Sequence, residues 1–279
     1  MSNGTKNLAL YCDFENIALG VRDARYARFD IQEVLERLLV KGNIVVKKAY
    51  CDWERYKDFK RDMHEASFEL IDIPHRRQSG KNSADIRMVV DALDLCYTKS
   101  HVDCFVIISG DSDFSPLVSK LRENNKLVIG VGVKESTSDL LIANCDEFIY
   151  YEDIVRKAKR RTPKSRGAAP TEAAEPATEQ PAAATNGNHA RKGEERRKKA
   201  HELVLSTLED ISSERDDQSN IWGSMVKQAI KRRKPSFSEN YHGFRSFGSL
   251  LEDMEQSELL ALEHDSKSGG YIITDFRRD

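Results

Sequence analysis

Residues 107–118 read IISGDSDFSPLV, and this stretch decides the fold class of the first half of the chain. A short apolar run stops at Ser109, two aspartates follow, and Ser115 with Pro116 is a favourable start for a helix. A buried strand that passes through a polar turn into a helix is the repeating unit of an open parallel α/β sheet. The same unit is therefore expected on both sides of this stretch.

Apolar runs and amphipathic stretches alternate from about residue 7 to residue 153. Six runs show little polar alternation, as expected of strands buried on both faces: residues 8–12, 43–50, 68–73, 103–109, 126–133 and 147–154. Five stretches between them carry apolar residues at helical spacing: residues 30–42, 54–66, 83–97, 115–125 and 136–145. This alternation predicts a doubly wound parallel sheet over residues 1–156.

The composition changes after residue 156. Residues 157–195 are basic at both ends and rich in Ala and Pro between them, so they are expected to form a flexible linker. Residues 196–279 then carry three helical patterns, at 200–211, 221–235 and 244–257, and a hairpin pattern at 259–276. Three helices followed by a hairpin predict a small winged helix-turn-helix domain.

Composition excludes several classes of protein. The 279 residues are 39% hydrophobic with a formal charge of -2, and this is typical of a soluble globular protein. The five cysteines form no CxxC pair, which argues against a zinc module or a disulfide framework. No segment has the roughly 18 apolar residues of a membrane helix, so a cytoplasmic protein is expected.

Two acidic clusters follow strands of the predicted sheet. In open α/β sheets, ligands bind beyond the carboxyl ends of the strands, because the loops converge there. The first strand runs into CDFENI and the fourth into SGDSDF, which supply Asp13, Glu15, Asn16, Ser109, Asp111 and Asp113. Turn formation and helix capping would explain one aspartate of the second cluster. Two neighbouring carboxylates repel each other unless a cation compensates them, so we favour a divalent metal site.

A third acidic contribution is expected from the stretch GKNSADIRMVVDAL. Asp85 lies one turn into a predicted helix and follows Lys81 by four residues, although a capping box with Asn82 explains Asp85 at least as well. Asp91 is about 120° around the helix from Asp85, so the two do not share a face. Asp139, after the fifth strand, is a further candidate that could also favour its own helix N-terminus.

Three motifs, YCDFENI (11–17), KNSADIRMVVDA (81–92) and VIISGDSDFSPLV (106–118), resemble the NYN domain, a LabA-like branch of the PIN-like nucleases. The family often has KGxD where this chain has KNSAD. The resemblance implies a PIN-like, Rossmann-like fold and a Mg²⁺ or Mn²⁺ site for RNA hydrolysis. It implies that the catalytic residues are Asp13, Asn16, Asp85, Asp111 and Asp113, with the four aspartates as metal ligands. Supporting roles are expected of Ser109, Lys81, Asp91 and Asp139.

The C-terminal part, above all residues 221–254, resembles the OST-HTH or LOTUS domain. This resemblance implies binding of RNA or of a protein partner. Basic and aromatic side chains that could contact RNA are Lys227, Lys231, Arg232, Arg233, Lys234, Tyr241 and His242. A solvated helix end would explain the basic residues equally well, and Phe244 and Phe247 are expected in the core.

The leading hypothesis is a metal-dependent ribonuclease, an endoribonuclease, with a tethered RNA-binding or targeting domain. The alternative is a non-catalytic RNA-binding or adaptor protein that uses the same fold as a platform. Clustered carboxylates favour the enzyme, since an adaptor has no need of them beside RNA phosphates. A toprim-type enzyme stays open as a weaker reading, because Glu15 follows the first strand.

Overall fold

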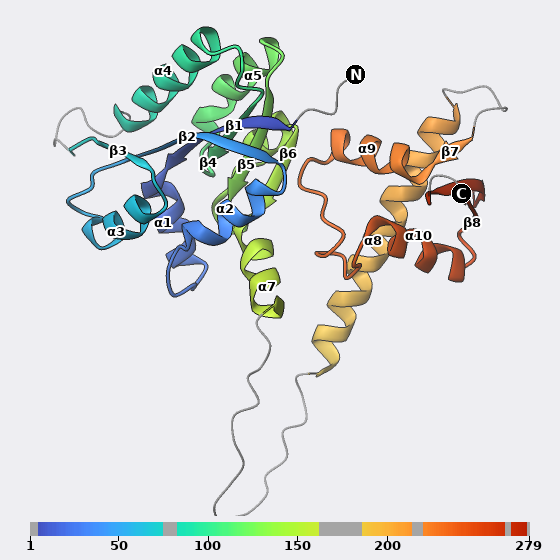
Figure 1. Cartoon of the computed structure of the whole chain (residues 1–279). Coiled ribbons are helices and arrows are strands. Elements are labelled where there is room, and N and C mark those ends of the chain that lie inside the picture. The colour runs from blue at the N-terminus through green and yellow to red at the C-terminus, as the bar shows by residue number, and fades with distance from the viewer. Residues whose placement is uncertain (1–4, 75–82, 162–185, 214–219, 266–268, 278–279) are drawn as a thin grey trace, which may run out of the picture. The chain divides into compact units, whose positions relative to one another are not determined.

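The computed structural model describes residues 5–74, 83–161, 186–213, 220–265 and 269–277 (Figure 1). These residues form two compact units, the first reaching Ala158 and the second taking most of the chain from Lys159 onward. Each unit has its own apolar core. No helix in the described part of the chain is long and apolar enough to cross a membrane.

The first unit is built on a six-stranded sheet in the order β3-β2-β1-β4-β5-β6. Every neighbouring pair of strands is parallel, so the predicted α/β fold with a parallel sheet is confirmed. The strands are β1 (Lys6–Asp13), β2 (Gly42–Cys51), β3 (Glu69–Asp72), β4 (Cys104–Ile108), β5 (Leu127–Gly132) and β6 (Glu147–Tyr150). The chain order reverses between β1 and β4, where such sheets bind ligands.

Helices cover both faces of this sheet (Figure 1). Alternate residues of β1 point to opposite faces: Leu8 and Leu10 enter one core, and Ala9 and Tyr11 enter the other. The first core also contains residues of α1 (Phe14–Asp23), α2 (Ile31–Leu39), α3 (Lys57–Glu65) and α7 (Tyr151–Arg161). The second contains residues of α4 (Ser83–Thr98), α5 (Ser115–Glu123) and α6 (Asp139–Asn144). The central strands are therefore buried on both sides.

Two elements differ from the sequence expectation. Helix α1 was not expected, because Asp, Glu and Asn after a strand look like a turn, yet Asp13 caps this helix by accepting a hydrogen bond from the Asn16 amide. The run predicted as one strand over 147–154 ends at Tyr150, and α7 begins at Tyr151. Tyr151 is almost fully buried at this junction, so apolar character alone did not separate strand from helix.

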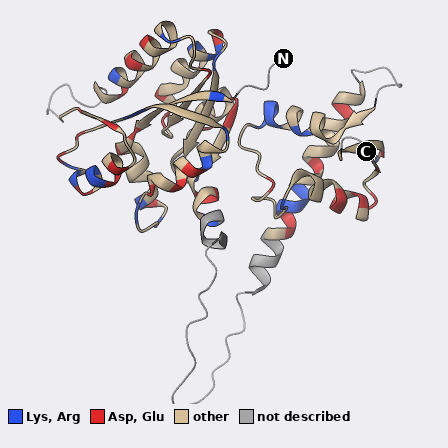
Figure 2. Ribbon diagram, in the orientation of Figure 1, with Lys and Arg blue, Asp and Glu red and all other residues tan. Residues whose placement is uncertain are grey.

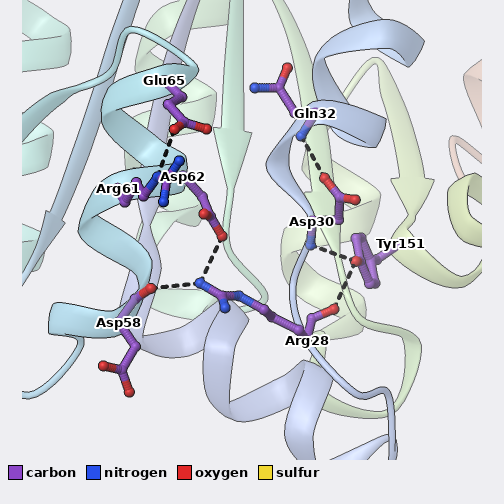
Figure 3. A network of polar contacts seen from close by, with 8 residues as sticks. All are labelled: Arg28, Asp30, Gln32, Asp58, Arg61, Asp62, Glu65 and Tyr151. Carbon is purple, nitrogen blue, oxygen red and sulfur yellow. Dashed lines mark hydrogen bonds and ion pairs between the residues drawn. The ribbon is translucent and has the colours of Figure 1, made fainter.

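A polar network fixes the connection between α1 and α2 (Figure 3). The Arg28 guanidinium lies 2.7 Å from the Asp62 carboxylate and donates to the Asp58 carbonyl at 2.6 Å, both on α3. The Tyr151 hydroxyl donates to the Arg28 carbonyl and accepts from the Asp30 amide at 2.8 Å. These contacts join the connection between α1 and α2 to α3 and α7.

The second unit contains α8 (Asn186–Ser213), β7 (Ile221–Trp222), α9 (Gly223–Arg233), α10 (Phe247–Gln256), β8 (Leu260–His264) and β9 (Tyr271–Phe276). Its antiparallel sheet has the order β7-β9-β8. Phe244 and Phe247 are buried in the core, as expected. The helix predicted from residue 221 begins instead at Gly223, because Ile221 and Trp222 pair with β9. The winged-helix assignment itself stays a prediction.

Both ends of the expected linker carry helix. Helix α7 continues to Arg161 and α8 begins at Asn186, whereas residues 162–185 lie outside the described part of the chain. The ends are rich in Ala, Lys, Arg and Glu, which are strong helix formers, so a basic composition did not by itself indicate an irregular segment.

Candidate functional site

The carboxyl ends of β1 and β4 are joined by side-chain hydrogen bonds. Asp13 is the last residue of β1 and is 8% exposed. Its Oδ2 accepts from the Ser109 hydroxyl at 2.9 Å, and its Oδ1 accepts from the Asn16 amide at 3.3 Å. The Asn16 Oδ1 accepts from the Gly110 amide at 2.8 Å. The two acidic motifs of the sequence therefore meet at one point of the sheet.

The acidic turn after β4 uses one aspartate as a cap. Asp111 accepts a hydrogen bond from the Asp113 amide at 3.0 Å and caps the short 3₁₀ turn η1 (Ser112–Phe114). Ser115 and Pro116 start the following helix as expected, but Ser115 is its first residue and Phe114 is its N-cap, so a capping role for Ser115 is wrong. The buried Ser115 hydroxyl has no hydrogen-bond partner among the described residues. Asp113 is exposed.

The carboxylates at this point oppose one another's ionisation. Burial raises the pKa of Asp13 to about 7, with a further contribution from the charge of Asp85, against the hydrogen bonds from Ser109 and Asn16. The pKa of Asp85 is also raised, to about 6. Burial is the largest cause, and the negative charges of Asp111 and Asp113 add to it. Asp85 lies in the first turn of α4, which thus brings a third acidic group toward β1 and β4. A cation at this point would relieve the repulsion.

An arginine that sequence reasoning missed lies beside the cluster. The Arg55 Nη1 is 3.1 Å from Glu15 Oε1, and the two side chains are 51% and 32% exposed. The charge of Glu15 also raises the pKa of Asp85, after burial, Asp111 and Asp113. Arg55 follows β2 by four residues, so its place beyond the carboxyl end of a strand next to β1 was the available signal.

Asp91 does not join the cluster. Its carboxylate accepts from the Tyr50 hydroxyl at 2.9 Å and from Arg87 at 3.0 Å, and its carbonyl accepts from the Tyr11 hydroxyl at 3.2 Å. These contacts fasten the middle of α4 to β1 and β2. Asp85 and Asp91 both lie on α4, where a spacing of six residues turns their side chains about 120° apart around the helix. Asp91 thus supports α4 rather than the acidic group.

Of the remaining supporting candidates, Asp139 lies among the described residues and Lys81 does not. Asp139 is exposed in the first turn of α6, whose N-cap is Ser138, and there a carboxylate suits the helix dipole. Lys81 and Asn82 lie outside the described residues, so neither the expected phosphate contact nor the alternative capping box has a structural description.

The donor set fits a hard divalent cation in its chemistry. Carboxylate and amide oxygens are the ligands that Mg²⁺ and Mn²⁺ prefer, and the cluster offers no sulfur or imidazole. Within the described ranges, no three His, Cys, Asp or Glu side chains stand in a ready metal-holding arrangement. The five cysteines are buried and free, and burial raises the pKa of Cys145 to about 12, so that thiol stays protonated.

The RNA-binding candidates in the C-terminal part of the chain fall into two groups. Lys231, Arg232 and Arg233 occupy the last turn of α9, visible as a basic end of that helix in Figure 2. Arg232, Arg233 and the following Lys234 are exposed. Tyr241, in contrast, lies under the Arg196 guanidinium at 4.6 Å, while Lys227 pairs with Glu239 and His242 Nδ1 is 2.7 Å from the Arg196 carbonyl. The aromatic pair thus already contacts the chain's own residues.

A parallel six-stranded sheet with acidic side chains beyond its central strands is the architecture of a PIN-like α/β domain. The family model of the NYN domain matches residues 7–152, just over half of the chain, and the chain belongs to this family. NYN domains are generally nucleases with RNA-related functions, and they typically use divalent metals.

Two similar proteins carry no assigned function. An uncharacterised protein of Methanocaldococcus jannaschii is 24% identical over 164 residues, which cover 56% of this chain and 63% of that protein. The chain thus matches less than two thirds of that relative's length. The crystal structure of a protein of unknown function from Vibrio parahaemolyticus is similar at 27% identity and a TM-score of 0.49, over 55% of this chain and 98% of the other.

Proposed function

We propose that this protein is a metal-dependent ribonuclease that hydrolyses RNA phosphodiester bonds at the carboxyl ends of β1 and β4. The observation that supports the proposal best is the raised pKa of both Asp13 and Asp85, in which burial comes first and the charges of neighbouring carboxylates add to it. Acids held this close at a ligand-binding edge of a sheet call for a cation. Asp13, Asp85, Asp111 and Asp113 are the side chains that would hold it.

When bound, Mg²⁺ or Mn²⁺ would acidify a water and offset negative charge on the attacking and leaving oxygens. The chain's own residues would position the groups that surround this chemistry. Ser109 keeps the Asp13 carboxylate in one orientation at 2.9 Å, and Asn16 holds the Gly110 amide at 2.8 Å, which fixes the turn that carries Asp111. Arg55 would contact a phosphate oxygen beside the cluster, because a guanidinium matches phosphate geometry.

For the C-terminal part of the chain we propose RNA binding in support of the nuclease, through a winged helix-turn-helix domain of the OST-HTH type. The exposed basic end of α9, Arg232 to Lys234, supports this role, since cations clustered on one helix end attract the phosphate backbone. Tyr241 and His242 would contribute only if a base displaced the contacts that they make with Arg196.

The proposal is tested by incubating the full chain with end-labelled single-stranded RNA or DNA of the same sequence, in Mg²⁺, Mn²⁺ or EDTA. We expect metal-dependent cleavage of RNA that is lost in the double variant Asp111→Asn/Asp113→Asn. Asp139→Asn is the matched control, because it removes an exposed acid at the same end of the sheet without touching the cluster. Cutting of a circular RNA would identify endonucleolytic cleavage.

Two results would contradict the proposal. Cleavage by the double variant at the wild-type rate would place the site elsewhere. Tight RNA binding without cleavage in every metal would instead favour a non-catalytic RNA-binding or adaptor protein that uses this fold as a platform.

A further inference from the structure

Helix α4 carries an exposed apolar stripe. Among the described residues, eight large apolar side chains are exposed, and three of them lie on α4: Ile86 (63%), Val90 (56%) and Tyr97 (62%). The partly buried Leu93 lies between them, so the stripe runs at spacings of four, three and four residues along one helix face. Figure 1 places α4 at the outside of the first unit. Contiguous exposed apolar side chains of this kind mark interaction surfaces.

The stripe is separate from the face that α4 packs on the sheet. Met88, Ala92 and Cys96 form the buried face and belong to the core around β1 and β4. The hydrogen bond from the Tyr50 hydroxyl to the Asp91 carboxylate fixes the helix from the inner side. Ile86, Val90 and Tyr97 are thus exposed beside this face, whereas Leu93 also contacts the edge of the core.

We propose that the stripe, Ile86, Val90, Leu93 and Tyr97, pairs with the same stripe of a second copy of this chain, with the two α4 helices antiparallel. The spacing of four, three and four residues is the same when read from either end. A second copy turned by a twofold axis therefore sets Ile86 against Tyr97 of the other copy, and Val90 against its Leu93. An interface between identical surfaces requires this self-complementarity.

Charge supports the antiparallel orientation. Arg87 and Asp94 are seven residues apart, so they lie on the same flank of the stripe. In the antiparallel pair, Arg87 of one copy faces Asp94 of the other at both ends of the interface. The guanidinium already pairs with Asp91 at 3.0 Å, and its five N–H donors leave capacity for a second carboxylate. In a parallel pair, the flank that carries Arg87 and Asp94 would instead face the opposite flank of the other helix, so the two charges would not meet.

The antiparallel pair has a consequence for the acidic cluster. Asp85 lies at the N-terminal end of α4, and in this register the two copies of Asp85 are thirteen residues apart along the helix axis, about 20 Å at 1.5 Å per residue. The two acidic clusters would therefore lie at opposite ends of the α4 pair. Dimerisation is inferred from the stripe alone and does not depend on the proposed nuclease activity.

The experiment is a measurement of molar mass by light scattering on the full chain over a wide range of concentrations. We expect a dimer for the wild type and a monomer for Ile86→Glu/Val90→Glu. Leu39→Glu/Val40→Glu is the matched control, because it makes the same change at two exposed apolar residues at the end of α2 (59% and 78%) and should leave the dimer intact. A monomeric wild type, or a dimer that survives Ile86→Glu/Val90→Glu, would overturn the proposal.

Exchanging the charges of Arg87 and Asp94 distinguishes loss of the dimer from unfolding of the variant. Asp94→Arg alone should weaken the dimer by setting two arginines together, and adding Arg87→Asp should restore it. Failure of the double exchange to recover any affinity, with an unchanged thermal unfolding curve, would count against the antiparallel register.

A cysteine cross-link tests the orientation directly. The five native cysteines are buried, so a surface cysteine can be modified selectively. In the antiparallel pair the two copies of residue 90 are about 4.5 Å apart along the axis and those of residue 97 about 16 Å apart. A short bismaleimide should therefore join Val90→Cys chains and leave Tyr97→Cys chains apart, whereas equal cross-linking of both would indicate a parallel pair.

Discussion

At the candidate site, the Asp13 carboxylate both accepts hydrogen bonds from neighbouring residues and keeps capacity for a metal ion. Its carboxylate accepts hydrogen bonds from the Asn16 amide and the Ser109 hydroxyl. A carboxylate has about four lone-pair directions, so two hydrogen bonds leave capacity for a metal ion. The same bonds favour the charged form, against the burial that favours the neutral one. Ser109, fully buried, thus orients Asp13 rather than acting on a substrate itself.

Because protons and metal ions compete for the Asp13 carboxylate, the stabilisation of the fold by metal should depend on pH. The pKa of Asp13 is raised from 3.8 to about 7 in the folded chain. The protonated Asp13 carboxyl group therefore contributes stability that is fully present below its pKa in the unfolded chain, about 4. This stability is lost as the pH rises through its pKa in the folded chain, about 7. The metal-free first unit should therefore unfold more easily at pH 8 than at pH 5. Mg²⁺ or Mn²⁺ should stabilise it more at pH 8, where no proton competes for the carboxylate.

Thermal unfolding with EDTA or metal, followed by the fluorescence of the buried Trp53 in a Trp222→Phe background, measures this response. Asp13→Asn is the control and should flatten both pH dependences. Equal metal-induced shifts at pH 5 and pH 8 would exclude Asp13 as the titrating ligand.

Arg55 gives a second prediction at the scale of single residues. If it binds a phosphate that is held equally in the ground and transition states, Arg55→Gln should raise KM for RNA about tenfold and change kcat little, as expected for one charged hydrogen bond. Arg61→Gln is the matched control, because Arg61 is 85% exposed on α3 and pairs with Glu65. Equal effects of the two variants would mean that Arg55 is only a surface cation.

The position of the acidic residues at one edge of the sheet could be predicted from sequence, and that of Arg55 could not, for physical reasons. Aspartates that interrupt an apolar run draw attention, because a buried strand has no use for them. Arg55 stands among other charged residues of an exposed segment, and only the placement of β2 beside β1 brings it to Glu15. Asp91 shows the reverse case, since its sequence context looked functional and its contacts hold a helix in place.

At the scale of elements, the connection after β4 packs tightly against the connection after β5. A Cβ atom at Gly110 would lie 2.4 Å from the Ser136 carbonyl oxygen and 3.0 Å from the Thr137 Cα. Backbone atoms cannot give way as flexible side chains can, so the two connections must separate if a side chain is added. The glycine of SGDSDF is thus required by packing between two loops.

Gly110→Ala should lower the free energy of unfolding by about 1–3 kcal/mol, as overpacking does, and should displace the turn that carries Asp111. We expect cleavage to be lost while the fold is retained, as measured by chemical denaturation and RNA cleavage. Gly193→Ala is the control, because a Cβ there meets no atom within 4 Å and alanine favours helix α8. Normal cleavage by Gly110→Ala would mean that the turn tolerates the shift.

Element boundaries were less predictable than element types. The six strands were foreseen because β-branched runs buried on both faces have a strong signature. Helix α1 was missed because its first turn contains the acidic residues of the site, whose capping role only the structure displays. The end of β6 was missed because strand and helix are both apolar at Tyr150 and Tyr151, and periodicity needs more residues than the strand offers.

At the scale of the whole molecule, the two units are expected to share RNA binding. Arg232→Glu/Arg233→Glu should weaken RNA binding and reduce the slope of log affinity against log salt by about 1.4, at about 0.7 for each lost phosphate contact on a single strand. Binding titrations at several salt concentrations measure the slope. Lys60→Glu/Arg61→Glu carries the same charge change on α3 and is the control; equal slopes in both variants would assign the α9 end to solubility.

The hydrogen bond from Ser109 to Asp13 spans 96 residues of the chain, and this distance has a consequence during synthesis. At about 5–20 residues per second, a ribosome needs about 5 to 20 s to add those 96 residues. Until β4 has been made, β1 lacks the neighbour that completes the acidic cluster. For the proposed nuclease, the messenger RNA that is being translated would lie beside an unfinished site for that interval, and cleavage would begin only after the fourth strand has left the ribosome.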